Sequence, residues 1–371
     1  KTVIVCKPVQ VGGSLCAVDV PWTWWNKFIG GRSLIVNADK EKAESVFEER
    51  IRPNIKVNIL EHWTGNEDDL KREKIVLNNG VCRCGSANVE NDFATFPADY
   101  VFLDEVAKFA SSRKETGGFD CIKAARGRQR EYNGMIGAHG VLSIVSSPKR
   151  HGDPLYNEIF KGGVLILRCH LPCPACGKYQ ELTDEQIKEI PNDKGEKDHN
   201  PSRIIQENAA EYECVHCKGT IRDIDRWKML KNYRWLAEGE DVKNGEIINQ
   251  NPLRDKAVDV CFWFNRLLSM PDKFTFADCL AAFFVARSSP DPKAWEAYQN
   301  EDMARFINPK AEKASYSYLL SKQLDYYQYS ELARVPQGVE IIFAGIDTQD
   351  DGFYYVVRGF GRNMETWLID R

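Results

Sequence analysis

The stretch Thr2-Val-Ile-Val-Cys-Lys7-Pro-Val-Gln-Val-Gly12-Gly13-Ser14, at the start of the chain, bears most directly on the fold. Its opening apolar run predicts a buried strand that leads into a glycine-containing loop. A strand, such a loop and a helix together place backbone N–H groups around phosphate oxygens. The standard phosphate loop has Lys directly before Ser or Thr, however, and here Gly13 occupies that place. Taken alone, the stretch fits a plain strand–helix turn better than a phosphate loop.

A second stretch, Ala98-Asp-Tyr-Val-Phe-Leu-Asp104-Glu105, strengthens the phosphate-loop interpretation. It predicts an apolar strand that ends in two carboxylates, and ligands of parallel sheets bind at the carboxyl ends of the strands. In a nucleotide hydrolase, the first acid orients the Mg²⁺ shell and the second positions the attacking water. Acidic pairs at strand ends are common, and it is the order of the two stretches that favours function. Lys7 could then return its ammonium to the phosphates, and Ser14 could supply a hydroxyl to Mg²⁺.

A third stretch, Val141-Leu-Ser-Ile-Val-Ser146-Ser147-Pro148, predicts a buried strand that ends in small hydroxyl residues. In motor ATPases, hydroxyls at this place can sense the γ-phosphate; a strand terminus with a turn is the alternative. Apolar runs that alternate with polar helical stretches predict an α/β protein with a mainly parallel sheet. The expected strands are 2–7, 33–37, 74–81, 100–103 and 141–146, and the expected helices include 40–50 and 119–132.

Two Cys-x-x-Cys pairs, Cys173/Cys176 and Cys214/Cys217, follow these strands. A two-residue gap lets both thiolates of one turn face the same ion, so the two turns together supply four sulfurs for tetrahedral Zn²⁺. Four unrelated thiols are the alternative. Because four sulfurs leave no open coordination position, a zinc ribbon here is expected to be structural or a docking surface.

The composition describes a soluble globular protein of two or three domains, with 371 residues, 43% hydrophobic residues and a net charge of −4. That charge gives no global attraction for nucleic acid, so any DNA contact needs a local patch. The best patches are 123–130, which could equally be a solvated helix face, and Lys149-Arg150. No apolar run is long enough for a membrane span.

The order of these motifs resembles the large terminase subunit of tailed bacteriophages, specifically the lambda-like GpA family. The most specific local motif is Cys173-Pro-Ala-Cys176-Gly-Lys-Tyr-Gln180, and the displaced lysine, Lys7 with Gly13, is a second shared feature. Further stretches that resemble family motifs are 117–120, 151–156, 262–269, 298–300 and 344–351. The resemblance covers nearly the whole chain.

This resemblance implies a P-loop NTPase-like mainly parallel sheet with an inserted zinc ribbon and the first strands of an RNase H-like nuclease domain. The implied divisions are an ATPase core at 1–168, a zinc ribbon at 169–225, a helical continuation at 226–310, a linker at 311–337 and the start of the nuclease at 338–371. Asp347 would be the first nuclease metal ligand. The chain would then be an internal fragment that lacks the preceding adenine-contacting segment and does not cut DNA by itself.

The implied function is the ATPase motor that packages double-stranded phage DNA into procapsids, in the host cell cytoplasm and without a membrane. Its expected cofactors are ATP, Mg²⁺ and Zn²⁺, and its expected partners are DNA, the small terminase subunit, the portal protein and further copies of itself. Glu105, Asp104 and Ser147 are the candidate catalytic residues. The candidate nucleotide-binding residues are Lys7, Gln10, Gly12, Gly13 and Ser14, with Ser14 and Asp104 also holding Mg²⁺.

One position departs from part of the family. Some members carry a charge-neutralising arginine inside the phosphate loop, where this chain has Gln10. Arg126, Arg128 or Arg130 could supply that charge instead. A zinc-ribbon protein that binds nucleic acid on a degenerate P-loop scaffold, without hydrolysis, is the alternative function.

Overall fold

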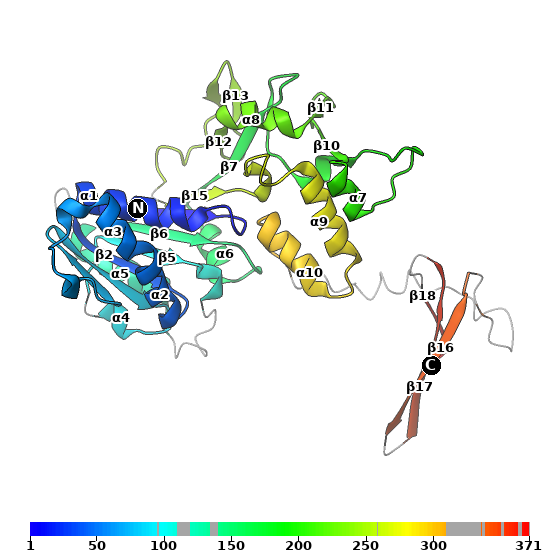
Figure 1. Ribbon diagram of the computed structural model, residues 1–371, viewed down its shortest axis with the longest axis horizontal. Helices are drawn as coiled ribbons and strands as arrows, with labels where there is room; N and C mark the ends of the chain where they lie inside the picture. Colours follow the sequence, from blue (N-terminus) through cyan, green and yellow to red (C-terminus); the bar gives the residue numbers. More distant parts are fainter. Residues whose placement is uncertain are drawn as a thin grey trace. The chain divides into compact units, whose positions relative to one another are not determined.

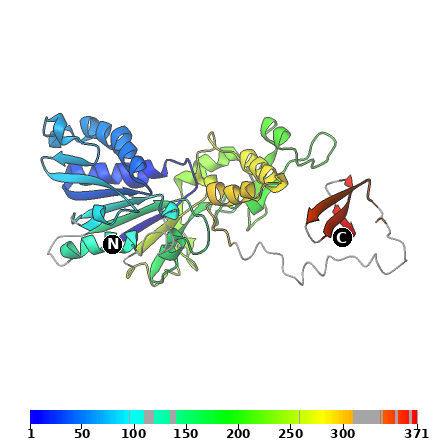
Figure 2. The ribbon, with the colours of Figure 1, turned by 90° about the horizontal axis from the view of Figure 1, so that it is seen from below.

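The computed structural model describes residues 1–94, 96–109, 119–133, 140–257, 259–308, 335, 338–349, 352–362 and 366–370. The chain divides into two compact units, Lys1–Asn308 and Pro309–Arg371. Figures 1 and 2 show the first unit as a large sheet with helices on both faces, joined to a smaller mixed region. The expected linker at 311–337 lies outside the described residues, apart from residue 335.

The first unit is organised by a sheet of 10 strands in the order β12-β7-β15-β1-β6-β5-β2-β4-β3, with β8 paired to β7. Neighbouring strands from β7 to β4 in this order run parallel. These parallel strands are β1 (Thr2–Cys6), β2 (Gly31–Asn37), β4 (Gly80–Ser86), β5 (Tyr100–Asp104), β6 (Val141–Ser146), β7 (Val164–Pro172) and β15 (Asp259–Trp263). The edge strands β3 (Lys74–Leu77), β8 (Tyr179–Gln180) and β12 (Arg234–Leu236) pair antiparallel. The predicted α/β fold with a mainly parallel sheet is confirmed.

Both faces of this sheet are buried, because successive side chains of its central strands enter different hydrophobic clusters. Ile35 of β2 packs into one cluster, and its neighbours Leu34 and Val36 pack into the other. The first cluster is covered by α1 (Val20–Phe28), η2 (Phe47–Ile51) and α3 (Arg52–Asn58). The second is covered by α4 (Asn91–Ala94), α5 (Cys121–Asn133) and α6 (Pro154–Ile159). This sandwich fixes the carboxyl ends of the strands along one edge.

The region around Lys74–Val81 differs from the prediction of one continuous strand. The chain instead forms a hairpin, in which β3 turns at Asn78-Asn79 and returns as β4. A two-residue turn rich in Asn and Gly is a common hairpin connection, and it interrupts the apolar run only briefly. Strand β4 then pairs parallel to β2 and adds to the main sheet.

The segment after β7 forms a mixed region built around a small sheet and helices. Its elements are β9 (Ile187–Glu189), α7 (Pro201–Gln206), β10 (Ala210–Glu213), β11 (Thr220–Ile221), α8 (Asp223–Lys231), β13 (Asp241–Lys243), β14 (Glu246–Ile248), α9 (Phe276–Ser288), α10 (Pro292–Ala297) and the π-helical turn η8 (Tyr298–Asp302). One hydrophobic cluster joins β10, α8 and α9 through Tyr212, Met229 and Phe276. A capping box starts α9, because Thr275 Oγ1 accepts from Asp278 N at 3.0 Å and Asp278 Oδ2 accepts from Thr275 N at 2.8 Å.

A strand that the sequence analysis missed lies inside the region expected to be helical. Residues Asp259–Trp263 form β15, which inserts between β7 and β1 in the main sheet. The chain therefore returns to the main sheet after the mixed region, and residues up to Asn308 belong to the first unit.

The second unit contains an antiparallel meander of β16 (Ile341–Gln349), β17 (Gly352–Phe360) and β18 (Thr366–Asp370). These strands lie within residues 338–371, where the family resemblance implies the first strands of the nuclease domain. Within the described residues, no helix combines the length and apolar character needed to cross a bilayer.

Candidate active site and metal centre

The loop after β1 begins between the carboxyl ends of two neighbouring strands. Lys7 N donates to Ser146 O of β6 at 3.1 Å, and Phe264 N, just after β15, donates to Cys6 O at 3.1 Å. The loop then reaches the π-helical turn η1 (Leu15–Asp19) and α1. Gly12 adopts a φ of +69°, a left-handed conformation that glycine accepts at little cost. The sequence-predicted strand–loop–helix is therefore present at the edge where parallel sheets bind ligands.

The side chain of Lys7 crosses this loop directly over Gly13. A Cβ added to Gly13 would lie 1.9 Å from Lys7 Cδ and 2.4 Å from Lys7 Cε. The lysine stem thus fills the space that a side chain at residue 13 would need. The Lys7 ammonium donates to Pro8 O at 3.4 Å, and burial lowers the pKa of this side chain. A lysine from the start of the loop therefore occupies the place where the standard loop carries its own.

Ser14 and Asp104 meet behind this loop. Ser14 Oγ donates to Asp104 Oδ1 at 3.4 Å, and Asp104 is buried at the end of β5. Burial raises the pKa of Asp104, whereas the Arg50 guanidinium, 3.8 Å from Oδ2, acts to lower it. Arg50 is itself held by Asp19 at 2.6 Å and 3.0 Å. A hydroxyl and a carboxylate at this separation are the oxygen ligands that Mg²⁺ uses beside phosphates.

Glu105 lies one residue beyond β5 and turns away from the strand. Its φ of 60° is left-handed, and its N–H donates to Val145 O at 2.7 Å. Its carboxylate forms ion pairs with Lys42 of α2 (Lys40–Val46) and with Lys108, the latter at 2.7 Å. Burial acts to raise the pKa of Glu105, but hydrogen bonds from Lys108 and Lys42 outweigh it, so that pKa is lowered. The carboxylate is thus kept ionised, as a group that orients water must be.

The two serines at the end of β6 have different surroundings. Ser146 is buried, and its Oγ accepts from Ala107 N at 3.0 Å and donates to Ser147 O at 3.0 Å. Ser146 therefore ties the end of β6 to the turn that follows Glu105. Both serines line the neighbouring cavity.

A cavity of about 800 Å³ lies against these motifs, a size within the usual range for ligand sites. Lys7, Glu105 and Ser147 line it together, although they are far apart in the sequence. Gln10, Gly12, Gly13, Ser14 and Asp104 are not among its lining residues. The remaining lining residues are Val9, Ala107, Lys108, Phe109, Ser146, Pro148, Lys149, Arg150, His151, Gly152, Asp153, Pro154, Lys293, Glu296, Ala297, Asn300 and Glu301.

Arg126, one of the three arginines considered as charge suppliers, has a different location. Arg126 pairs with Glu158, with Nη1 to Oε1 at 3.0 Å, and lies 3.9 Å from Asp259. Asp259 is the first residue of β15 and pairs with Thr2, whereas Lys7 follows the last residue of β1. Arg126 is therefore held near the amino ends of the strands, whereas the phosphate loop lies at their carboxyl ends. Arg130 has no described side chain.

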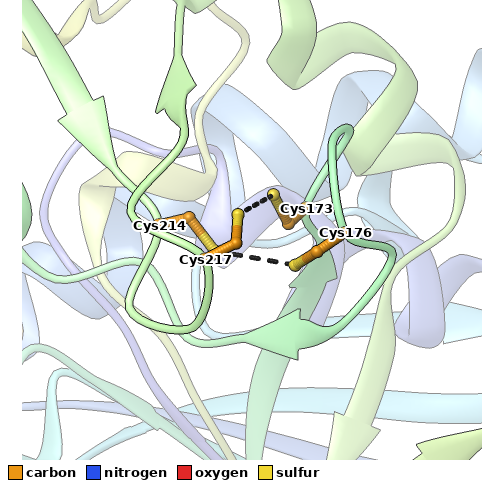
Figure 3. A group of neighbouring side chains, drawn as sticks. All are labelled: Cys173, Cys176, Cys214 and Cys217. Atoms are coloured by element: carbon orange, nitrogen blue, oxygen red, sulfur yellow. Dashed lines mark hydrogen bonds between the residues drawn. The ribbon is translucent and has the colours of Figure 1, made fainter.

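The four paired cysteines converge, as Figure 3 shows. Their sulfurs all lie within 4.8 Å of one another, and the Cys173–Cys217 and Cys176–Cys214 sulfurs are 3.9 Å apart. Tetrahedral zinc with Zn–S bonds of about 2.3 Å needs sulfurs about 3.8 Å apart, so the group fits that ion.

The backbone of the two cysteine turns is matched. Gly177 N donates to Cys173 O at 2.9 Å in the first turn, and Lys218 N donates to Cys214 O at 3.0 Å in the second. Such tight turns point both sulfurs of a pair to the same side. The four cysteines therefore form a group that is compatible with a metal ion.

The expected nuclease ligand, Asp347, lies exposed in β16 opposite Tyr354. Across the residues that the structure describes, the four cysteines are the one group of three or more potential ligands close enough for an ion. Asp347 is thus not joined to a metal site among the described residues.

The parallel sheet, the loop after β1 and the acids after β5 define an α/β protein of the P-loop nucleotide-binding class. Comparison with protein families is more specific. The chain belongs to the phage terminase large subunit gpA family: the family's ATPase domain matches residues 1–235, and its endonuclease domain matches residues 259–371. The matched endonuclease segment starts at β15, which pairs with β1 in the ATPase sheet, so the structural division at Asn308 falls later than the family boundary.

Individual relatives are distant. The chain is 22% identical to the terminase large subunit of Escherichia phage lambda over 397 aligned residues, which cover 100% of this chain. It spans about half of that protein, 56% of its length. The large terminase ATPase domain of Thermus phage P74-26 is 14% identical, with a TM-score of 0.39 over 82% of this chain and 88% of that domain. A point mutant of the same domain gives a TM-score of 0.40 at 15% identity, over 82% of this chain and 89% of the mutant.

Proposed function

We propose that this chain is the ATP-hydrolysing motor part of a large terminase subunit, which packages double-stranded phage DNA into procapsids. The observation that carries the proposal is the Lys7 side chain lying over Gly13, in the same cavity as Glu105 and Ser147. A displaced lysine would be hard to interpret alone. Its position over the loop supports its assignment to the role of the missing lysine, and the family's ATPase domain matches this part of the chain.

The positions of the residues support the following proposed roles. Lys7 and the loop amides of Gly12 and Gly13 bind the β- and γ-phosphates, and Gln10 lies within the same loop. Ser14 and Asp104 hold Mg²⁺, which when bound neutralises charge that develops on the phosphates. The Glu105 carboxylate accepts a hydrogen bond from the attacking water. This bond orients the water in line with the γ-phosphate. Ser147 contacts the γ-phosphate in the cavity. When hydrolysis removes this phosphate, Ser147 transmits the change to the end of β6.

Release of Glu105 is part of this scheme. Its carboxylate is paired with Lys42 and Lys108, and a carboxylate saturated by two ammonium groups is a poor acceptor for a water proton. Glu105 must therefore exchange at least one of these lysines for water before hydrolysis. Glu105 and Lys108 both line the cavity, whereas Lys42 is not among its lining residues.

The partners and further activities are proposed at the level of the whole terminase. DNA, the small terminase subunit, the portal protein and further copies of the chain would assemble with it in the host cell cytoplasm. DNA cutting would belong to the longer protein, with Asp347 as one of its metal ligands. Cys173, Cys176, Cys214 and Cys217 would hold one structural Zn²⁺, supported by the spacing of their sulfurs.

Replacing Glu105 with Gln tests the ATPase proposal. The amide keeps the size of the side chain and cannot take up a proton, so Mg-ATP binding should stay within about 3-fold of the parent while turnover falls by about 100-fold or more. Binding is measured by calorimetry and turnover by phosphate release. The matched control is Glu67→Gln, an exposed carboxylate that also pairs with a lysine, Lys56 at 2.6 Å, and it should change neither quantity. Unchanged turnover in Glu105→Gln would contradict the assignment.

The non-hydrolysing zinc-ribbon protein is not favoured, because the cavity joins Lys7, Glu105 and Ser147. It predicts a parent protein with no affinity for Mg-ATP and no effect of Lys7→Ala.

A further inference from the structure

Three cationic residues that line the nucleotide cavity, Lys149, Arg150 and Lys293, have no role in the scheme above. Arg150 follows the Ser146-Ser147-Pro148 end of β6 and lines the cavity with Lys7 and Glu105. Its Nη2 lies 3.1 Å from both carboxylate oxygens of Glu296, on α10. More than half of the Arg150 side chain is exposed, so the guanidinium is solvated and able to reorient.

The far wall of the cavity is formed by α10 and η8, and the segment from η8 to Ile307 is hydrogen-bonded to both nucleotide motifs. Val9 N, in the phosphate loop, donates to Glu301 O at 2.9 Å. Ile307 N donates to Lys149 O at 2.9 Å, and His151 N returns a bond to Ile307 O at 2.9 Å. The Arg150–Glu296 pair is thus the ionic part of a contact between the turn after β6 and the segment that leads to Asn308.

We propose that Arg150 binds the γ-phosphate of ATP, and that Glu296 competes with this phosphate for the same guanidinium. The inference rests on the proposed function, since it needs nucleotide in this cavity. A guanidinium matches the geometry of a phosphate and binds it through two parallel hydrogen bonds. ATP therefore offers Arg150 a stronger partner than an exposed carboxylate does, whereas ADP lacks the γ-phosphate.

Two further observations favour Arg150 over other cations. Arg126 is held by Glu158 near the amino ends of the strands. Lys7 is already buried across the phosphate loop. Arg150 lies three residues after Ser147, to which the γ-phosphate is assigned, and both residues line the same cavity. Arg150 would therefore provide the positive charge that some family members supply from an arginine at the position of Gln10.

Exchange of partners would also change the contact with α10. When Arg150 turns to phosphate, Glu296 loses the ionic partner that links α10 to the turn after β6. Loss of the γ-phosphate would restore the pair. The Arg150–Glu296 ion pair thus opens when the γ-phosphate is bound and forms again when it is lost, which couples the nucleotide state to the end of the first unit.

The test compares a non-hydrolysable Mg-ATP analogue with Mg-ADP by titration calorimetry on the whole chain. Arg150→Ala should weaken binding of the ATP analogue by about 10- to 100-fold and leave the affinity for ADP within about 2-fold of the parent, because only the ATP analogue contacts the guanidinium. Glu296→Gln should tighten the ATP analogue by about 2- to 5-fold, the worth of an exposed ion pair, with no change for ADP. The double variant should behave like Arg150→Ala.

The matched controls are Arg72→Ala and Glu48→Gln, which break another exposed ion pair of the first unit, 3.0 Å long, and should alter neither affinity. Equal losses for ADP and the ATP analogue in Arg150→Ala, or weaker ATP binding in Glu296→Gln, would overturn this inference alone. A parent that binds neither nucleotide would overturn both the inference and the proposed function. Melting temperatures near that of the parent confirm that each variant is folded.

Discussion

The contact between Lys7 and Gly13 gives a sharp prediction, because a single methyl group at residue 13 should remove the lysine from its place. The added Cβ would lie 1.9 Å from Lys7 Cδ, whereas ordinary contacts begin at 3.4 Å, so the stem must move by the difference of 1.5 Å. The three nearest atoms to that Cβ all belong to the Lys7 side chain. Gly13 does not have a left-handed φ, so the backbone itself accepts alanine. The protein should therefore stay folded while the ammonium is displaced.

The expected loss is that of one charge-assisted hydrogen bond to phosphate. Such bonds contribute about 1.5–3 kcal/mol, which corresponds to about 10- to 150-fold weaker binding of Mg-ATP. Lys7→Ala should give a similar loss, and the double variant should be no worse than either single one, because both changes remove the same interaction. Lys7→Ala combined with Gly13→Lys should recover binding, since it returns the lysine to the place that the standard loop uses.

Calorimetry with Mg-ATP measures the affinity, and a thermal melt checks the fold. Gly127→Ala is the matched control, because a Cβ there meets no atom within 4 Å and the residue lies in α5. The reasoning is refuted if Gly13→Ala binds Mg-ATP like the parent. Losses that add in the double variant would refute it equally, because they would show that the two residues act separately.

Two other predictions concern stability. Freshly purified protein should contain one Zn²⁺ per chain, and the Cys173→Ser and Cys214→Ser variants should lack this ion and melt at a lower temperature. The control Cys16→Ser, outside the cysteine group, should keep both the ion and the melting temperature of the parent. Metal analysis that finds no zinc in the parent would contradict the site. The buried carboxylate of Glu240 accepts hydrogen bonds from Arg254 at 2.6 Å and 2.8 Å, which lower its pKa from 4.5 to about 2. A carboxyl pKa that is lower in the folded than in the unfolded protein stabilises the fold at a pH above the unfolded pKa. Glu240→Gln should therefore lower the free energy of unfolding by up to about 3 kcal/mol at pH 7. Urea unfolding should show this difference between parent and variant shrinking as the pH falls from 4.5 towards 2. A difference that stays constant over that range would count against the ion pair as its cause.

The central strands could be predicted from the sequence, and the failures have identifiable causes. Strands β1, β5 and β6 are short apolar runs with polar residues on both sides, which local patterns detect. The hairpin at β3 and β4 was missed because only Asn78-Asn79 interrupts it. Strand β15 was missed because its apolar run is too short to distinguish strand from helix, and its partners β1 and β7 are remote in the sequence. Pairing at that range is a tertiary property.

The candidate site divides in the same way. Lys7, Ser14, Asp104 and Glu105 could be proposed because their order along the chain follows a known chemistry. Their charged neighbours could not, since Lys42, Arg50 and Arg150 are polar residues of helices and turns, where most such side chains are solvated. Their partners come from elements distant in the chain, so no local pattern marks them.

The phosphate loop shows why the sequence and the structure had to be combined. In the sequence, a lysine too early and a glycine where lysine is expected are two separate departures from the standard loop, and each weakens the assignment. In the structure they are one arrangement, because the Lys7 stem occupies the volume that any side chain at residue 13 would take. Either change without the other would leave the loop with no ammonium or with two side chains in one space. The two departures therefore support each other, and their joint presence is stronger support for phosphate binding than either residue could give.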